Sequence, residues 1–317
     1  MPQACDVGHR VVVRRLVDLG PHGRPRFTDL LGDLVALDNE RLVLRTRDGV
    51  EHTVLRTEVV AAKRIPPAPA RYSEIAALEQ VADAAWPAPV RERLGEWILR
   101  AADGWTGRAN SALPLGDPGL PLAEAIHAVA TWYGQRRLRP AVNVPLPLRR
   151  DVGDALAARG WRALPLVLVQ VAHLPDMRPG TPAGGGPPPV LLGEPSADFL
   201  AVAASRKQSL PDAAHHVLTA VASVRFAEVR GEDGALLAMA RGAVVEDWLH
   251  LGLVEVAPAA RRRGLARRVS QALSAWAADE GASRAFLQVE AHNIAAVDLY
   301  AGLGFATHHR YLTYRAP

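Results

Sequence analysis

Residues 254–268 read VEVAPAARRRGLARR, and this stretch decides the fold of the C-terminal part of the chain. Its first three residues alternate apolar and polar side chains, as a half-buried strand does. Pro258 ends that strand, because proline has no N–H to donate to a neighbouring strand. A turn with Gly264 follows, and apolar residues then recur at helical spacing as far as Trp276. The sequence therefore predicts a strand, a glycine turn and a helix in direct succession.

The turn has the chemistry of an anion site. The first N–H groups of a helix have no partner within the helix, and the helix dipole is positive at that end. Gly264 has no Cβ, which lets a phosphate group approach its backbone closely. An ordinary turn beside a solvated arginine cluster would share this pattern, so the turn alone leaves both interpretations open.

A second block of residues follows in the order that a known family requires. It reads N-x-x-A-x-x-L-Y-x-x-x-G-F, with its fixed positions at Asn293, Ala296, Leu299, Tyr300, Gly304 and Phe305. This block and the R-x-x-G-x-A of the turn resemble two motifs of the GNAT superfamily of acyl-CoA-dependent N-acetyltransferases, namely the acetyl-CoA and leaving-group helix and the pyrophosphate loop. The resemblance implies acetyl-CoA as cofactor and a catalytic GNAT domain at residues 190–317.

The resemblance also implies where the cofactor binds. In GNAT enzymes the pantetheine arm lies between two splayed parallel strands, here residues 248–256 and 285–289. The implied cofactor-binding residues are Val254, Glu255, Val256, Arg261, Arg262, Arg263, Gly264, Leu265, Ala266, Asn293, Ala296 and Tyr300. The N–H of Val254 takes the family position that polarises the thioester carbonyl. The N–H groups of residues 262–266 take the pyrophosphate, assisted by the charges of Arg261 and Arg263.

Two of these positions have a structural alternative. Gly252, in the middle of the first strand, marks either the bulge that splays the two strands or a simple packing gap. Asn293 either contacts the cofactor or caps the helix that begins at the next residue, and both can be true.

The catalytic residues must take a proton from the amine and give one to the departing thiolate. Tyr300 is the predicted general acid, because a phenol with a pKa of about 10 can donate to a thiolate. His250 is the first candidate for the base, since some family members carry a base there and histidine titrates near pH ~6.5. Glu255 is the second candidate. Further alternatives are a water molecule and the side chains of Glu290, Glu246 and Asp247.

The middle of the chain repeats the C-terminal part. The offset of 144 residues that separates Trp132 from Trp276 also carries Gly160 onto Gly304. Leu156 then stands at the place of Tyr300, and Pro121 stands one residue out of that offset at the place of Gly264. Proline there removes an N–H and brings a ring to the phosphate path. We therefore predict that residues 71–175 form a degenerate GNAT-like domain that no longer binds acyl-CoA.

The N-terminal residues 1–66 are predicted to form a small SH3-like β-barrel. Asp48-Gly49 is a hairpin turn signal between two of its strands. The predicted strands are residues 11–17, 30–36, 42–46, 50–55 and 59–60. The module could bind a peptide or nucleic acid, or it could be a structural piece. A Gly/Pro linker at residues 176–189 separates the degenerate domain from the catalytic one.

The remaining periodicities complete an α/β (α+β) fold, because crossover helices join the strands. Helices are predicted at residues 72–85, 90–101, 122–133, 151–159, 196–205, 213–219 and 294–301. Strands are predicted at residues 104–115, 141–144, 165–173, 190–192, 224–229, 235–245 and 307–314. The acceptor is expected in a cleft bounded by Arg241, Trp248 and the helices after Ser196.

Composition narrows the function classes. The 317 residues are 49% hydrophobic with a net charge of +4, and they hold one cysteine, which fits a reducing cytoplasm. No apolar run reaches the roughly 18 residues of a membrane span. Apart from the arginines of the turn no basic run stands out, so nucleic acid is an unlikely partner. Adjacent histidines at His308-His309 and His215-His216 have poor spacing for ligands, and no metal is predicted.

The predicted function is acetyl-CoA-dependent transfer to a primary amine of a small molecule or a protein. The layout resembles an actinobacterial, histone-acetyltransferase-like type of GNAT protein with an N-terminal SH3-like domain. One alternative is a tandem acetyltransferase similar to mycothiol synthase, and another is a non-catalytic acyl-CoA sensor. A homodimer is possible.

Overall fold

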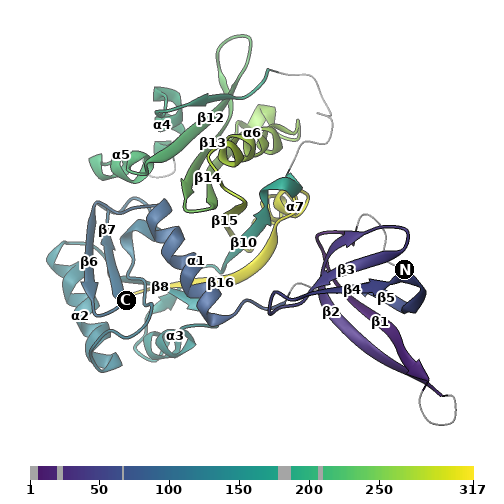
Figure 1. Ribbon diagram of the computed structural model, residues 1–317. Helices are drawn as coiled ribbons and strands as arrows, with labels where there is room; N and C mark the ends of the chain where they lie inside the picture. The colour runs from purple at the N-terminus through teal and green to yellow at the C-terminus, as the bar shows by residue number, and fades with distance from the viewer. Residues whose placement is uncertain (1–5, 20–23, 66–67, 178–186, 206–209) are drawn as a thin grey trace. The chain divides into compact units, whose positions relative to one another are not determined.

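A computed structural model describes residues 6–19, 24–65, 68–177, 187–205 and 210–317, and most of the predicted linker 176–189 lies outside them. The chain divides into two compact units, Met1–Pro69 and Ala70–Pro317. Figure 1 shows the N-terminal unit as a sheet without helices longer than a single turn, and the C-terminal unit as a mixed layer of strands with helices on its faces.

The N-terminal unit is one antiparallel sheet in the order β4-β3-β2-β1-β5. Its strands are β1 (Arg10–Leu19), β2 (Pro25–Leu37), β3 (Arg41–Arg45), β4 (Glu51–Leu55) and β5 (Val59–Arg64). Alternate residues such as Leu42 and Leu44 are fully buried, as a sheet with one covered face requires. The prediction of an all-β segment is confirmed, whereas its assignment as an SH3-like barrel stays a prediction.

The C-terminal unit contains a nine-stranded mixed sheet in the order β11-β12-β13-β14-β15-β10-β16-β8, with β9 beside β16. Its strands are β8 (Ala141–Leu146), β9 (Arg162–Ala163), β10 (Val167–His173), β11 (Val190–Leu192), β12 (Ser223–Arg230), β13 (Leu236–Val245), β14 (Trp248–Val256), β15 (Arg284–Glu290) and β16 (Ala306–Arg315). Its helices are α1 (Tyr72–Ala85), α2 (Leu122–Gln135), α3 (Arg150–Ala157), α4 (Ala197–Ser205), α5 (Asp212–Thr219), α6 (Leu265–Asp279) and α7 (Ile294–Ala301).

We call residues 71–175 the first half of this unit and residues 190–317 the second half. The two halves exchange strands, because β10 of the first half lies between β15 and β16 of the second. In return β16 pairs with β8 of the first half. All of these pairings are antiparallel, and one continuous sheet therefore joins the halves.

The central strand β14 sends alternate side chains to two different cores. Leu249 and Leu251 pack with α6 and α7 on one face. Trp248 points to the other face, where α1 covers the sheet with Leu78 and Val81. Figure 1 shows α6 lying along β13 and β14. None of the described helices is long and apolar enough to span a membrane.

Two predictions for the first half are wrong. Residues 90–101 form a hairpin of β6 (Val90–Leu94) and β7 (Trp97–Ala101) instead of a helix. All five residues of β7 are buried, and a short apolar run of this kind satisfies helical and strand spacing equally well. Residues 104–115 hold a short 3₁₀ turn, Arg108–Asn110, and two isolated bridges instead of a strand.

Candidate active site

The parallel strands β14 and β15 come apart halfway along. They pair from Trp248 with Arg284 to Leu251 with Leu287, and the register ends there although both strands continue. On the other side of β14, the pairing with β13 shifts between Met239 and Arg241, which makes a bulge. Leu253 has a φ of 52° within this bulge. The two strands therefore open like a V, as the resemblance to GNAT enzymes implies.

Gly252 lies beside the bulge, and its missing side chain makes room in the wall of a cavity. A Cβ added there would stand 3.2 Å from Cε1 of His250 and 3.7 Å from Cζ3 of Trp86. The residue with the left-handed backbone is the next one, Leu253. Of the two interpretations of Gly252, the structure favours the one based on packing.

The turn before α6 has the backbone shape of an anion cradle. Gly264 is the N-cap of α6 with a φ of 74°, and Arg262 has a φ of 61°. Left-handed residues in such a turn make successive N–H groups point into one concavity. A Cβ added at Gly264 would meet nothing within 4 Å, so the space in front of the turn is open. These residues fit a pyrophosphate group.

The opening of the V leads to a cavity of about 440 Å³ between the two halves of the C-terminal unit. The first half contributes Trp86, Trp105 and Arg108 to its wall. The second half contributes His250, Gln288, Glu290, Tyr311 and Arg315. Trp86 and Trp105 stack at a centroid distance of 5.7 Å. Aromatic, aliphatic and polar side chains thus share the wall of the cavity.

His250 is buried in this wall and is held from several sides. Its Nε2 atom lies 3.3 Å from Nη1 of Arg108 and 3.2 Å from Oε1 of Gln288. Its ring stacks on Phe286 at 4.9 Å. Burial, followed by the charges of Arg108 and Arg241, lowers the pKa of His250 well below its usual value. The imidazole is therefore neutral at pH 7, and it is a weak proton acceptor.

The carboxylates predicted as bases lie in different places. Glu290 is the one carboxylate among the residues that line the cavity, 3.2 Å from Nε2 of His292. Glu255 lines a smaller cavity of about 290 Å³ together with Val256 and Arg261. Asp247 accepts hydrogen bonds from Arg284 and Ser283, outside both cavities. The structure therefore brings Glu290, but not Glu255, into contact with the main cavity.

Tyr300 and Asn293 lie on α7, on the α6 face of the sheet. Tyr300 packs against Phe305 at a centroid distance of 5.7 Å, and its side chain does not line the cavity. Burial raises the pKa of Tyr300 to about 12, so the phenol keeps its proton at neutral pH. Oδ1 of Asn293 accepts a hydrogen bond of 3.3 Å from the N–H of Ala296, which confirms that Asn293 caps α7.

The expected acceptor cleft is wrong for Arg241 and Trp248, whereas α4, one of the helices after Ser196 that were expected to bound it, does line the cavity through Ala203. Arg241 is fully buried and donates to the carbonyl oxygens of Leu218 and Ala85 at 2.7 and 3.1 Å. Trp248 packs against Phe286 in the α1 core. Neither side chain lines the cavity. Both were placed from their positions on two neighbouring strands, which do not show what a distant segment contributes.

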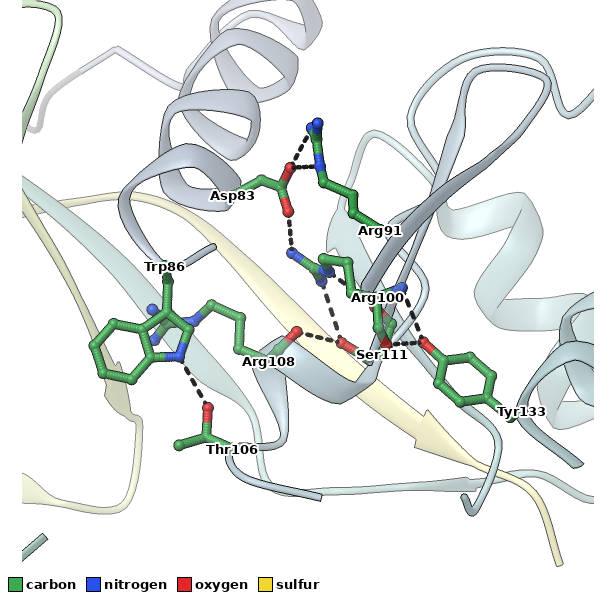
Figure 2. Close-up of polar contacts among 8 residues, drawn as sticks. All are labelled: Asp83, Trp86, Arg91, Arg100, Thr106, Arg108, Ser111 and Tyr133. Carbon is green, nitrogen blue, oxygen red and sulfur yellow. Dashed lines mark hydrogen bonds and ion pairs between the residues drawn. The ribbon is translucent and has the colours of Figure 1, made fainter. Parts of the chain in front are cut away.

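A buried polar network fixes the segment that carries Arg108 (Figure 2). Asp83 of α1 accepts from Arg91 at 2.9 Å and from Arg100 at 3.1 Å. Arg100 donates to the carbonyl oxygen of Ser111, whose hydroxyl donates to the carbonyl oxygen of Arg108. Figure 2 also shows Nε1 of Trp86 donating to the hydroxyl of Thr106 at 3.1 Å. The first half thus positions one wall of the cavity.

Among the residues that the structure describes, no three metal-ligating side chains come together. The splayed parallel strands, the glycine turn at a helix start and the mixed sheet are the features of a GNAT-family N-acetyltransferase. The chain is an enzyme of this class. It belongs to the family of the C-terminal part of the probable histone acetyltransferase Rv0428c, whose model matches residues 72–314.

Known proteins with a similar sequence or fold agree with this assignment. The probable histone acetyltransferase Rv0428c of Mycobacterium tuberculosis is 32% identical over 318 residues, which cover 96% of this chain and 95% of that protein. The uncharacterized N-acetyltransferase YobR of Bacillus subtilis is 26% identical over 236 residues, 74% of this chain and 95% of YobR. A GCN5-related N-acetyltransferase from Kribbella flavida superposes with a TM-score of 0.57 at 17% identity, covering 79% of this chain and 97% of that one.

Proposed function

We propose that the protein transfers the acetyl group of acetyl-CoA directly to a primary amine of a small molecule or a protein. The observation that carries the proposal is the end of the β14–β15 pairing at Leu251 and Leu287, next to the open turn at Gly264. An acetyl-CoA molecule that enters between β14 and β15 would have its phosphates at the start of α6 and its acetyl group at the cavity.

The chain offers contacts along this whole path. Residues 254–256 of β14 lie beyond the part of the strand that pairs with β15. The N–H groups of residues 262–266 and the side chains of Arg261 and Arg263 would take the pyrophosphate. Ala296, Asn293 and Tyr300 of α7 complete the predicted set. When bound, the cofactor supplies an acetyl thioester with a thiolate leaving group.

The remaining chemistry falls to side chains and backbone groups. The N–H of Val254 would donate to the carbonyl oxygen as negative charge develops there. The amine nitrogen forms the new amide bond as the carbon–sulfur bond breaks, and it loses one proton. Tyr300, which burial keeps protonated, would give a proton to the sulfur. His250 and Glu255 remain proposals for the proton acceptor, and the contact of Glu290 with the cavity adds a third.

We also propose that the first half is a degenerate GNAT-like domain without a cofactor site. Pro121 is the N-cap of α2, the place that Gly264 has at α6. Leu156 is fully buried at the position of Tyr300. The SH3-like barrel, a homodimer and a cytoplasmic location are further parts of the proposal, the last supported by the single cysteine.

The test is acetyl transfer by the full chain to a panel of primary amines and lysine peptides, followed by mass spectrometry of the products. Gly264→Glu should lower the rate at least about a hundredfold, because its carboxylate would repel the pyrophosphate and fill its space. Gly281→Glu is the matched control. Gly281 also has a left-handed φ, of 90°, with open space around it, and it follows the other end of α6.

Equal rates in the two variants would contradict the cofactor site. A wild-type protein that binds acetyl-CoA but acetylates no amine or peptide would favour the acyl-CoA sensor. A product formed only with amines of a thiol pathway would favour a transferase similar to mycothiol synthase.

A further inference from the structure

Two arginine side chains lie near the ring of Trp86 without a carboxylate partner among the described residues, and one of them, Arg108, lines the cavity. Arg108 lines the wall with its guanidinium 5.6 Å from the ring of Trp86, and Arg241 lies 5.0 Å from the same ring. Within the part of the chain that the structure describes, neither forms an ion pair. Arg241 is held by backbone carbonyl oxygens, and Nε of the Arg108 side chain is buried without a hydrogen-bond partner among the described residues.

The nearby carboxylates are already engaged. Asp83 of α1 accepts from Arg91 and Arg100, and Glu79 of the same helix lies 2.8 Å from Nε2 of His309. The positive charges of Arg108 and Arg241 therefore repel each other without a neutralising carboxylate between them. Burial, followed by the charge of Arg108, lowers the pKa of Arg241 to about 9. Buried positive charge of this kind is stabilised by an anion, and the cavity is the open space beside it.

The rest of the wall limits the size and polarity of what can enter. A volume of about 440 Å³ is in the range of small-molecule sites, which span roughly 300–1,000 Å³. Trp105, Leu164 and Val167 give it apolar surface. Glu290 is the one negative side chain in the wall, and it can attract an ammonium group. The wall thus offers two cations, Arg108 and Arg315, one carboxylate and apolar surface to one small molecule.

We propose that this cavity binds the acceptor, and that the acceptor is a small amino carboxylic acid with an apolar body, whose carboxylate pairs with Arg108. Glu290 then holds the amino group toward the open end of the β14–β15 pair. This proposal rests on the acetyl transfer proposed above. It narrows the acceptor from any primary amine to a small molecule that has both an amino group and a carboxylate. A protein lysine side chain has no carboxylate on the same residue and does not match it.

The first experiment compares acceptors that differ only in the carboxylate. Phenylalanine and leucine should be acetylated with a kcat/KM at least about tenfold above that of phenethylamine and isopentylamine, which lack it. Arg108→Gln should remove this preference by lowering the kcat/KM of the two acids about tenfold. Arg225→Gln is the matched control, because Arg225 also lies over a tryptophan, Trp276 at 5.4 Å, and does not line the cavity. If phenethylamine and isopentylamine are accepted as well as phenylalanine and leucine, the proposal about the acceptor is overturned. The proposal of acetyl transfer would still stand.

A binding experiment keeps the proposal testable if Arg108→Gln fails to fold or if no amine is acetylated. Phenylacetate has the carboxylate and the apolar body but no amine, and its binding to the full chain can be measured by calorimetry without cofactor. The wild type and Arg108→Lys should bind it, and Arg225→Gln should bind it equally well. A wild type that binds phenethylamine but not phenylacetate would overturn the proposal.

Discussion

Both halves of the C-terminal unit contain a helix, a strand and a second helix in succession, α2-β8-α3 and α6-β15-α7, but they differ at the two points that matter for a cofactor. Helix α3 spans Arg150–Ala157 and α7 spans Ile294–Ala301, and each precedes a glycine with a positive φ. Helix α2 begins after Pro121 with a φ of −51°, whereas α6 begins after Gly264 with a φ of 74°. Both halves have a buried core, and a left-handed glycine is the N-cap itself only in the second, whereas in the first half the left-handed Gly119 lies two residues before the N-cap.

The proposal that the first half has no cofactor site is compatible with its packing. Leu156 fills the core of the first half at the place where Tyr300 stands in the second, so packing needs only an apolar side chain there. The first half still completes the sheet through β10, and it supplies Trp86 and Arg108 to the cavity. The first half therefore supports the shared sheet and forms one wall of the cavity.

The largest expected effect tests whether the first half is needed as a rigid support. Asp83→Asn should cost about 3–5 kcal/mol of unfolding free energy, because it leaves the buried guanidinium of Arg100 without its partner. The measurement is chemical denaturation. Asp247→Asn, which breaks the exposed ion pair with Arg284, is the control and should cost less than about 1 kcal/mol. Equal costs would contradict a supporting role for this network.

The next prediction compares Tyr300 on α7 with Leu156, the residue at the corresponding position on α3. Tyr300→Phe should lower kcat about a hundredfold with little change in acetyl-CoA affinity, because it removes a proton donor. Leu156→Ala should cost about 2–5 kcal/mol of stability, because it opens a cavity in a core. Folded Leu156→Ala protein should keep its kcat. Turnover that is unchanged in Tyr300→Phe would remove Tyr300 from the mechanism.

The third prediction is that the protein loses stability in acid, and that buried histidines of the second half cause this loss. Burial, followed by the charge of His309, lowers the pKa of His308 to about 4, and burial also lowers the pKa of His250 well below its usual value. An unfolded histidine binds its proton near pH ~6.5, so between about pH 4 and 6.5 the unfolded chain binds more protons than the native one. Stability is full above this range and falls as the pH falls through it.

We expect a loss of about 1–2 kcal/mol between pH 7 and pH 5, a figure reduced because His308 is partly exposed. Thermal unfolding at the two pH values measures it. His308→Gln should show a smaller loss than the wild type, and an identical loss would assign the effect to other groups.

The smallest effect concerns the cap of α7. Asn293→Ala should cost about 1 kcal/mol, because the N–H of Ala296 loses its acceptor. If the cap is its whole role, the acetyl-CoA affinity changes less than about twofold. A tenfold weaker affinity, measured by calorimetry at a temperature where the variant is folded, would add a direct contact with the cofactor.

Local patterns in the sequence predicted the elements of the second half well. The strand, turn and helix around Gly264 are present, and the parallel pairing of β14 with β15 is confirmed. Helix α1 begins and ends where its periodicity predicts. These features depend on spacing and on backbone preferences that a single segment carries by itself.

Features that depend on distant segments could not be read in the same way. The insertion of β10 between β15 and β16 joins strands more than a hundred residues apart, and no local pattern encodes the choice of partner. The cavity has the same origin, because Trp86 and Arg108 come from the first half and His250 from the second. The all-buried β7 could not be told from a helix for the separate reason that its apolar run is too short.

The central claim is that only the second half binds acetyl-CoA. The most direct test is a calorimetric titration of the full chain with acetyl-CoA, in the wild type and in Gly264→Glu. The account predicts one equivalent bound per chain in the wild type and none in the variant. Two equivalents in the wild type, or one equivalent retained in Gly264→Glu, would contradict it and place a cofactor site in the first half.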